Sequence, residues 1–152
     1  MGTFETTGDV IEHARLFHRE LGRYYHRLSD SVKQGRVRML LDYLSKQETL
    51  LEDALSKYSR GGEQRIMTVW LQYTPELAKL EKIADMDLAP GMSIDEVARM
   101  ALELDDSLVR LYRAVIENID DEGVQEVFQN LVDQQQQEQA QLKKNATWLK
   151  HV

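Results

Sequence analysis

Apolar residues recur every three or four positions along most of this chain, the spacing that places side chains on one side of an α-helix. A first stripe predicts a helix over about residues 6–32, and a second predicts one reaching about residue 58, with Gly35 marking the short connection between them. Thr6, followed three residues later by Asp9, resembles the capped start of a helix. The stripes consist of Val10, Ala14, Phe17, Leu21, Tyr24 and Leu28 in the first helix and Val37, Leu41, Leu44, Leu51 and Leu55 in the second.

The pattern breaks over residues 60–92 and then resumes. The break predicts a mixed connection, with one short helix near residues 66–71 and another beginning at Pro75. Ser93 and Glu96 form a capping box that predicts the start of a third long helix. An acidic turn at residues 120–123 precedes a fourth, which runs to about residue 149. Its apolar stripe passes unbroken through the glutamine run at residues 134–137, so this run is predicted to be helical rather than disordered.

The two halves of the chain resemble each other when one is shifted by 87 residues. Residues 6–55 align with residues 93–142 without a gap and share nine identical residues, most of them on the apolar stripes. We interpret this as a duplication in which two antiparallel helical hairpins, residues 6–58 and 93–149, pack face to face in a single domain of 152 residues. The crossover between them, residues 60–92, is long enough to return along a bundle of about 35 Å, whereas a simple up-down-up-down bundle needs only a short loop.

Five polar residues lie on or beside the inward stripes near the middle of their helices. They are His18, Glu48, Asp105, Gln135 and Glu138. A carboxylate buried without a partner is costly, so partners or a metal ion are expected. One interpretation is a hydrogen-bonded network in which His18 contacts Glu48 or Asp105, and Gln135 contacts Glu138. The other is a site for one iron, manganese or zinc ion held by His18, Glu48, Asp105 and Glu138.

Two segments near this cluster carry a recognisable pattern: residues 101–105 followed by Tyr112, and residues 131–138. They resemble the rubrerythrin-like branch of the ferritin superfamily. In that family the first helix of each hairpin carries a Glu followed seven residues later by a Tyr, the second carries Glu-x-x-His, and these side chains hold two irons. The resemblance implies an all-α, ferritin-like four-helix bundle with a long helical crossover, in a protein of the bacterial cytoplasm.

Carried over position by position, the metal-binding positions of that family are mostly changed in this chain. At the six positions stand, in chain order, His18, Glu48, Leu51, Asp105, Gln135 and Glu138. Only Glu48 matches by type, Leu51 has no donor atom, and Gln135 is a weak neutral ligand. We therefore predict no catalytic residues and no resident cofactor, with a single ion on His18, Glu48, Asp105 and Glu138 as the alternative.

These changes predict a scaffold or interaction protein that has lost dinuclear iron chemistry, rather than an enzyme. The rival hypothesis is a metal-dependent oxidoreductase or a metal-handling stress protein with a reduced, mononuclear site. Leu51 and Gln135 are the residues that separate the two hypotheses. An enzyme has little use for Leu at a ligand position, whereas a scaffold gains core packing from it.

The composition of the chain limits which kinds of partner and which cellular location are expected. The chain has no cysteine, which excludes disulfides and thiolate metal sites, and its net charge of −7 disfavours nucleic acid and anionic membranes. No stretch approaches the roughly 20 apolar residues of a membrane span, and the N-terminal segment lacks signal-peptide features, so a cytoplasmic location is expected. We expect a homodimer, with Met67, Trp70 and Leu71 of the crossover as a candidate contact surface, and any other protein partner is unspecified.

Overall fold

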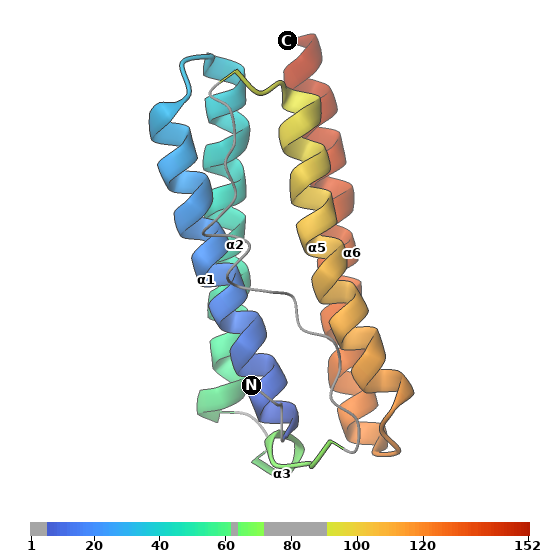
Figure 1. Cartoon of the computed structure of the whole chain (residues 1–152). Helices are drawn as coiled ribbons and strands as arrows, with labels where there is room; N and C mark the ends of the chain where they lie inside the picture. The colour runs from blue at the N-terminus through green and yellow to red at the C-terminus, as the bar shows by residue number, and fades with distance from the viewer. Residues whose placement is uncertain (1–5, 62–63, 72–90) are drawn as a thin grey trace.

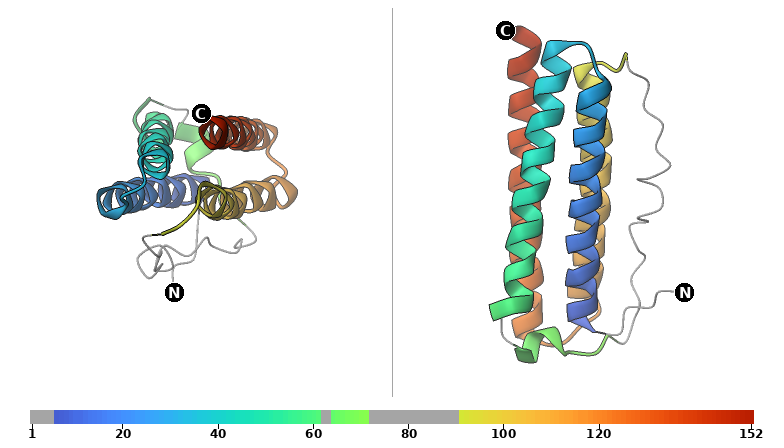
Figure 2. Two further views of the ribbon diagram at one scale, coloured as in Figure 1. Left: turned by 90° about the horizontal axis from the view of Figure 1, so that it is seen from above. Right: turned by 90° about the vertical axis from the view of Figure 1, so that its left-hand side faces the viewer.

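The structure is a computed structural model that describes residues 6–61, 64–71 and 91–152. The helices in this part of the chain are α1 (Thr7–Ser31), α2 (Gly35–Gly61), the short α3 (Gln64–Met67), α5 (Ile94–Glu117) and α6 (Glu122–His151). The four long helices stand side by side as a bundle (Figure 1), and seen from above they follow the order α1, α2, α6, α5 around a square (Figure 2). The predicted all-α bundle of two helical hairpins is confirmed.

Matching capping boxes start the first helix of each hairpin. The backbone N–H of Asp9 donates to the Thr6 hydroxyl at 3.2 Å, and the Thr6 N–H donates to the Asp9 carboxylate at 2.9 Å. Ser93 and Glu96 make the same pair of hydrogen bonds at the start of α5. Each box satisfies N–H groups that the first helical turn leaves without a partner. The helix starts predicted at Thr6 and Ser93 are therefore confirmed.

Some predicted helix boundaries differ from the observed ones. Gly35 was expected in the connection but is the first residue of α2, and this helix continues through Arg60 to Gly61. Asp121 caps α6, so Gly123 of the predicted turn is already helical. A helical Gly costs about 1 kcal/mol relative to Ala, which the packing of a long helix overrides. The short helix predicted to begin at Pro75 lies outside the described residues.

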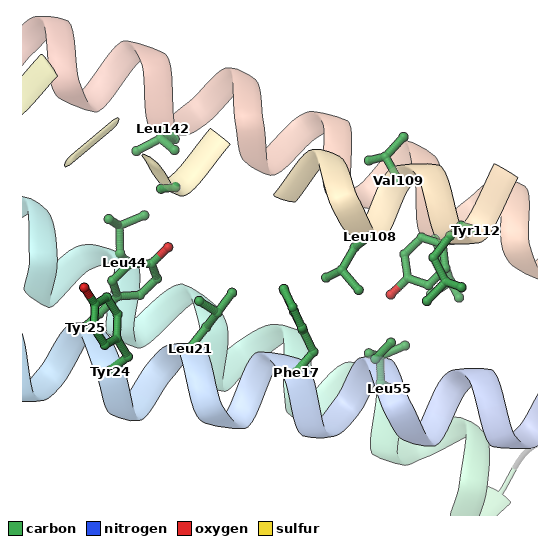
Figure 3. Packing of buried hydrophobic residues seen from close by; sticks show 14 of the residues in the cluster. Phe17, Leu21, Tyr24, Tyr25, Leu44, Leu55, Leu108, Val109, Tyr112 and Leu142 are labelled. Atoms are coloured by element: carbon green, nitrogen blue, oxygen red, sulfur yellow. The ribbon is translucent and has the colours of Figure 1, made fainter. Parts of the chain in front are cut away.

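The apolar stripes of the four long helices meet along the axis of the bundle. In Figure 3, side chains from α1 and α2 project towards those of α5 and α6. The largest fully buried side chains are Phe17, Leu21, Tyr25, Leu40, Leu41, Leu108, Leu111, Tyr112, Phe128, Leu142 and Ile11. Burial of one such apolar side chain stabilises the fold by about 1.5–3 kcal/mol, so this seam is the main source of stability.

The start of the crossover closes one end of the bundle. The N–H of Thr7 in α1 donates to the carbonyl of Val69 at 3.0 Å, and Arg65 forms an ion pair with the α6 cap Asp121 at 2.6 Å. Met67 and Leu71 pack against the core, whereas Trp70 is 68% exposed. Of the three crossover residues named as a candidate contact surface, Trp70 is the most exposed, and Met67 and Leu71 are partly buried. The expectation of a homodimer stays a prediction.

Equivalent positions of the two hairpins make equivalent contacts. In the first, Arg19 Nε donates to Glu52 at 2.9 Å, and in the second, Gln139 Nε2 donates to Asp106 at 2.6 Å. Arg19 corresponds to Asp106 and Glu52 to Gln139 in the 87-residue alignment. The same two positions therefore join the helices of each hairpin, although the residue types have changed.

No helix within the described residues combines the length and apolar character needed to cross a bilayer.

Candidate functional site at the centre of the bundle

Each long helix buries one polar residue of the predicted cluster in the interior. His18 on α1, Glu48 on α2, Asp105 on α5 and Gln135 on α6 are all below 5% exposed. Glu138, one turn beyond Gln135, is half-buried. The prediction that these positions face the interior is confirmed for the first four, and Glu138 lies at the border of the core.

His18 and Glu48 form a hydrogen-bonded pair inside the first hairpin. The imidazole Nδ1 contacts the Glu48 carboxylate oxygen Oε2, as one of the two predicted interpretations required. Gly22 brings α1 close to α2 here, because a Cβ at this position would lie 3.4 Å from the Glu48 Cβ. The Ser45 hydroxyl also donates to the Gly22 carbonyl at 3.0 Å. The close helix approach holds Glu48 against the imidazole.

Asp105 and Gln135 occupy the equivalent positions in the second hairpin but are not satisfied in the same way. Asp105 Oδ1 and Gln135 Nε2 are buried and have no hydrogen-bond partner within the described part of the chain. Burial raises the pKa of Asp105 well above its ordinary value, the charges of Glu48 and Glu138 raise it further, and the nearby Gln135 amide acts weakly in the opposite direction. Burial and the neighbouring negative charges therefore disfavour the ionised form of Asp105.

Glu138 accepts hydrogen bonds from residues of α2 rather than from Gln135, its neighbour on α6. The Tyr43 hydroxyl donates to Oε1 at 2.9 Å, and the Gln47 side-chain amide is placed to donate to Oε2 at 3.0 Å. Burial raises the pKa of Glu138, the Tyr43 hydrogen bond lowers it, and the charge of Glu48 raises it. The predicted Gln135–Glu138 hydrogen bond is wrong, because the Gln135 amide makes no such contact.

Sequence reasoning did not identify Tyr43 as part of this site. The signal was available in the spacing, since Tyr43 lies four residues before Gln47 and therefore on the same side of α2. Gln47 itself is one of the identities between the two halves of the chain. What the sequence did not show is that this side of α2 faces Glu138.

Three further residues at positions of the rubrerythrin-like pattern, Leu51, Tyr25 and Tyr112, are buried and bring an aliphatic side chain and two phenol rings to the core. Leu51 is 6% exposed, and it corresponds to Glu138 in the alignment of the two halves. Tyr25 and Tyr112 are fully buried, and burial followed by the charges of Glu48 and Asp105 raises both of their pKa values. The Tyr25 hydroxyl has no hydrogen-bond partner within the described residues. Both phenols are therefore neutral at ordinary pH.

The donor set does not fit a dinuclear carboxylate centre. Leu51 offers no donor atom, Gln135 offers only a neutral amide, and Glu48 is already paired with His18. Within the described ranges, no group of three or more His, Asp or Glu side chains is arranged to hold a metal ion. Two divalent ions bring about four positive charges, and the position-matched side chains offer at most three carboxyl groups, those of Glu48, Asp105 and Glu138, to balance them.

Comparison with solved structures identifies the architecture. The chain is similar over 97% of its length to 97% of a Thermotoga maritima protein described as a "putative ferritin-like diiron-carboxylate protein", with a TM-score of 0.65 and 17% sequence identity. This chain has the ferritin-like fold. The sequence matches no protein-family model and no curated protein. At this identity the likeness extends to the ferritin-like fold and leaves the chemistry of the site to be argued from the residues themselves.

Proposed function

We propose that this protein is a ferritin-like scaffold or interaction protein that has lost dinuclear metal chemistry. The observation that carries the proposal is Leu51, which is buried at a position where the rubrerythrin-like pattern has a metal-binding His. A leucine side chain has no lone pair to offer a metal, and its burial favours the folded state by about 1.5–3 kcal/mol. At this position the chain has gained packing where the family pattern has a ligand.

The hydrogen bonds of the remaining carboxyl groups support the same conclusion. Glu48 is paired with His18, and Glu138 accepts from Tyr43 and Gln47. Burial raises the pKa of Asp105, which disfavours its ionised form. Metal binding requires deprotonated carboxylates and free imidazole lone pairs, so each of these arrangements opposes it. Hydrogen bonds from the protein itself thus engage Glu48 and Glu138.

A mononuclear site is the second candidate function, and one observation favours it. Asp105 Oδ1 is buried without a hydrogen-bond partner among the described residues, and the charges of Glu48 and Glu138 both raise the Asp105 pKa. A cation at this level would relieve that repulsion. His18, Glu48, Asp105 and Glu138 would be its ligands, a nitrogen and oxygen set suited to iron, manganese or zinc. Such an ion would supply Lewis-acid or one-electron chemistry when bound.

Elemental analysis of protein purified without chelator, from cells supplied with iron and manganese, separates these functions. The proposal predicts substoichiometric iron, manganese and zinc and no absorption from oxo-bridged iron. It also predicts that added iron leaves the melting temperature nearly unchanged, because a ligand stabilises a fold only when it binds the native state appreciably.

A dinuclear cluster placed by anomalous scattering between His18 and Gln135 would refute the scaffold proposal. A single stoichiometric ion would favour the second candidate, provided that it is lost in both Glu48→Gln and Asp105→Asn. Leu50→Ala serves as the control variant for metal content, because Leu50 is 62% exposed on α2 and outside the cluster.

A further inference from the structure

The charges of this chain are distributed unevenly along the bundle. Residues 31–41, which lead into α2, and residues 139–152, at the end of α6, contain no Asp or Glu, although the chain has 26 of them. Residues 117–126, at the other end of the bundle, hold five acidic residues and no Lys or Arg. The net charge of −7, which by itself disfavours an anionic partner, therefore conceals one basic end. The cations of the two acid-free segments are Lys33, Arg36, Arg38, Lys143, Lys144 and Lys150.

The start of α2 and the end of α6 lie side by side at the end of the bundle opposite α3 (Figures 1 and 2). The guanidinium of Arg36, in the first turn of α2, donates to the carbonyl of Val152 at the end of α6. Because these two helices run antiparallel, Met39, three residues beyond Arg36, lies at the level of Trp148, four residues before Val152. The two side chains are 53% and 58% exposed and form a small apolar surface there.

Exposed cations surround this apolar pair. Lys144 stands four residues before Trp148 and therefore on the same side of α6. Arg38 adjoins Met39 in the chain, and Lys33 lies in the turn before α2. None of these three cations forms an ion pair with another described residue. We call this surface the basic tip and define it by Lys33, Arg36, Arg38, Met39, Lys144 and Trp148.

The acidic residues that flank the two acid-free segments in the chain have partners of their own. Asp30 lies 3.9 Å from His26 Nε2 on α1, and Asp42 accepts from the Ser29 hydroxyl at 2.5 Å. Glu138 accepts from the α2 side chains at the centre of the bundle. The flanking carboxylates are thus engaged away from the basic tip, which keeps its positive charge.

We propose that the basic tip docks on the surface of a bilayer that contains anionic phospholipids. Lys and Arg side chains around an aromatic ring match the two layers of such a surface, the charged phosphates and the hydrocarbon beneath them. Trp148 and Met39 enter the headgroup layer, where an indole is favoured because its ring is apolar and its N–H is polar. The same surface repels the acidic residues 117–126, so the bundle stands on the bilayer by its basic tip.

Other anionic partners fit the basic tip less well. Single-stranded nucleic acid is held by several aromatic side chains on which successive bases stack, and the basic tip has one aromatic ring. Duplex DNA is held by cations that follow its phosphates, whereas here an apolar pair lies among the cations. Lysine is depleted in protein interfaces, which disfavours an acidic protein as the partner of Lys33 and Lys144.

The basic tip is separate from the polar cluster at the centre of the bundle. Trp148 lies ten residues beyond Glu138, which is about 15 Å along α6. The inference therefore goes beyond the proposed function, and metal analysis of the central cluster can neither support it nor refute it.

Vesicle sedimentation tests the proposal with the full chain. In about 0.1 M salt, we expect binding to equimolar phosphatidylserine–phosphatidylcholine vesicles, binding about tenfold weaker or less to pure phosphatidylcholine, and loss of binding in about 1 M salt. Trp70→Phe leaves Trp148 as the sole indole, and its emission should shift to the blue on binding. In Trp148→Phe the emission of Trp70 should not shift.

Three outcomes of these measurements would overturn the proposal. They are absence of binding to the anionic vesicles, equal binding to both kinds of vesicle, and a blue shift of Trp70 alone. Fluorescence anisotropy with single-stranded and duplex oligonucleotides runs in parallel. Tighter binding to either oligonucleotide than to the anionic vesicles would overturn the proposal in favour of a nucleic-acid partner.

Charge substitutions at the two ends of the bundle supply matched variants. Lys33→Gln with Lys144→Gln should weaken binding to the anionic vesicles about 25-fold, at about fivefold for each cation, with an unchanged midpoint in urea. Lys57→Gln with Arg113→Gln is the control with the same change in net charge, because both residues are exposed and form no ion pair with another described residue.

The control variant should bind the anionic vesicles as the wild type does. Lys57 lies 18 residues beyond Met39 on α2, about 27 Å away, which exceeds the screening length of about 10 Å in 0.1 M salt. Unchanged binding in Lys33→Gln with Lys144→Gln, or an equal loss in the control, would overturn the assignment of the basic tip.

Discussion

The two helical hairpins have the same arrangement of helices, but the buried polar residues at their centres differ in whether they are hydrogen-bonded. In the first, a buried imidazole contacts a buried carboxylate, His18 with Glu48. In the second, the equivalent residues are Asp105 and Gln135, and each leaves a buried polar atom without a partner in the described chain. Two equivalent hairpins can therefore hold a satisfied pair and an unsatisfied pair at the same level of one core.

The difference shows which interactions the fold itself requires. Both hairpins keep a contact between the helices at the positions of Arg19 and Glu52, although it is ionic in one and an amide–carboxylate hydrogen bond in the other. Both also keep a buried tyrosine, Tyr25 or Tyr112. The apolar packing and the placement of contacts are common to the two halves, whereas the polar residue types at the centre have diverged.

The largest expected effect comes from breaking the satisfied pair. His18→Leu leaves the Glu48 carboxylate buried without its partner, and we expect the free energy of unfolding to fall by about 3–5 kcal/mol. Urea denaturation measures this change. Adding Glu48→Met to His18→Leu removes the orphaned charge and should recover most of the loss, since an apolar replacement of a buried pair is often neutral. If the double variant is no more stable than the single one, the pair is not the unit that we describe.

A comparable loss is expected at the position where the hairpins differ most, Leu51 against Glu138. Leu51→Ala should lower the free energy of unfolding by about 2–5 kcal/mol because it leaves a cavity in the core. The adjacent Leu50→Ala is the matched control, and this 62% exposed residue should change stability by no more than about 0.5 kcal/mol. Equal midpoints for the two variants in urea would contradict the helix register of α2.

The stability of the protein should depend on pH through Asp105 in the second hairpin. The pKa of Asp105 is raised in the folded state, so the folded chain binds this proton more tightly than the unfolded chain. The bound proton therefore adds to the free energy of unfolding. This contribution is fully present at pH values below the ordinary pKa of 3.8 and is lost as the pH rises through the folded-state pKa. Asp105→Asn lacks this loss, so its melting temperature should exceed that of the wild type by an amount that grows with pH across this window. A constant difference across the window would contradict the assignment.

The smallest effect is expected where the two halves keep the same contact with different residues. Glu52→Gln removes a partly buried carboxylate that binds both Arg15 and Arg19, and should cost about 1 kcal/mol in low salt and less in high salt. Gln139→Ala, at the equivalent position, should cost no more than about 0.5 kcal/mol at either salt concentration. Thermal unfolding at two ionic strengths distinguishes ionic from amide pairing, and equal salt dependence would contradict the distinction.

The order and type of the elements could be predicted from the sequence because the information is local. The three-and-four spacing of apolar residues, together with capping pairs such as Thr6 with Asp9, marks a helix without reference to the rest of the chain. The identities between the halves predicted the two hairpins, and the bundle confirms them. Helix ends near Gly35, Gly61 and Gly123 were harder to place, because tertiary packing outweighs the small local cost of a glycine.

The sequence by itself determined that polar residues would occupy the centre of an apolar core, since each interrupts or borders a stripe of known period. Only the tertiary structure decided which of these polar residues form hydrogen bonds with one another. Glu48 faces His18 because Gly22 brings α1 close to α2, and Glu138 is bound by Tyr43 and Gln47 instead of Gln135. The reason is physical: periodicity assigns a residue to a side of its own helix, whereas a hydrogen bond depends on the distance and rotation between two helices, which the packing of the whole bundle sets.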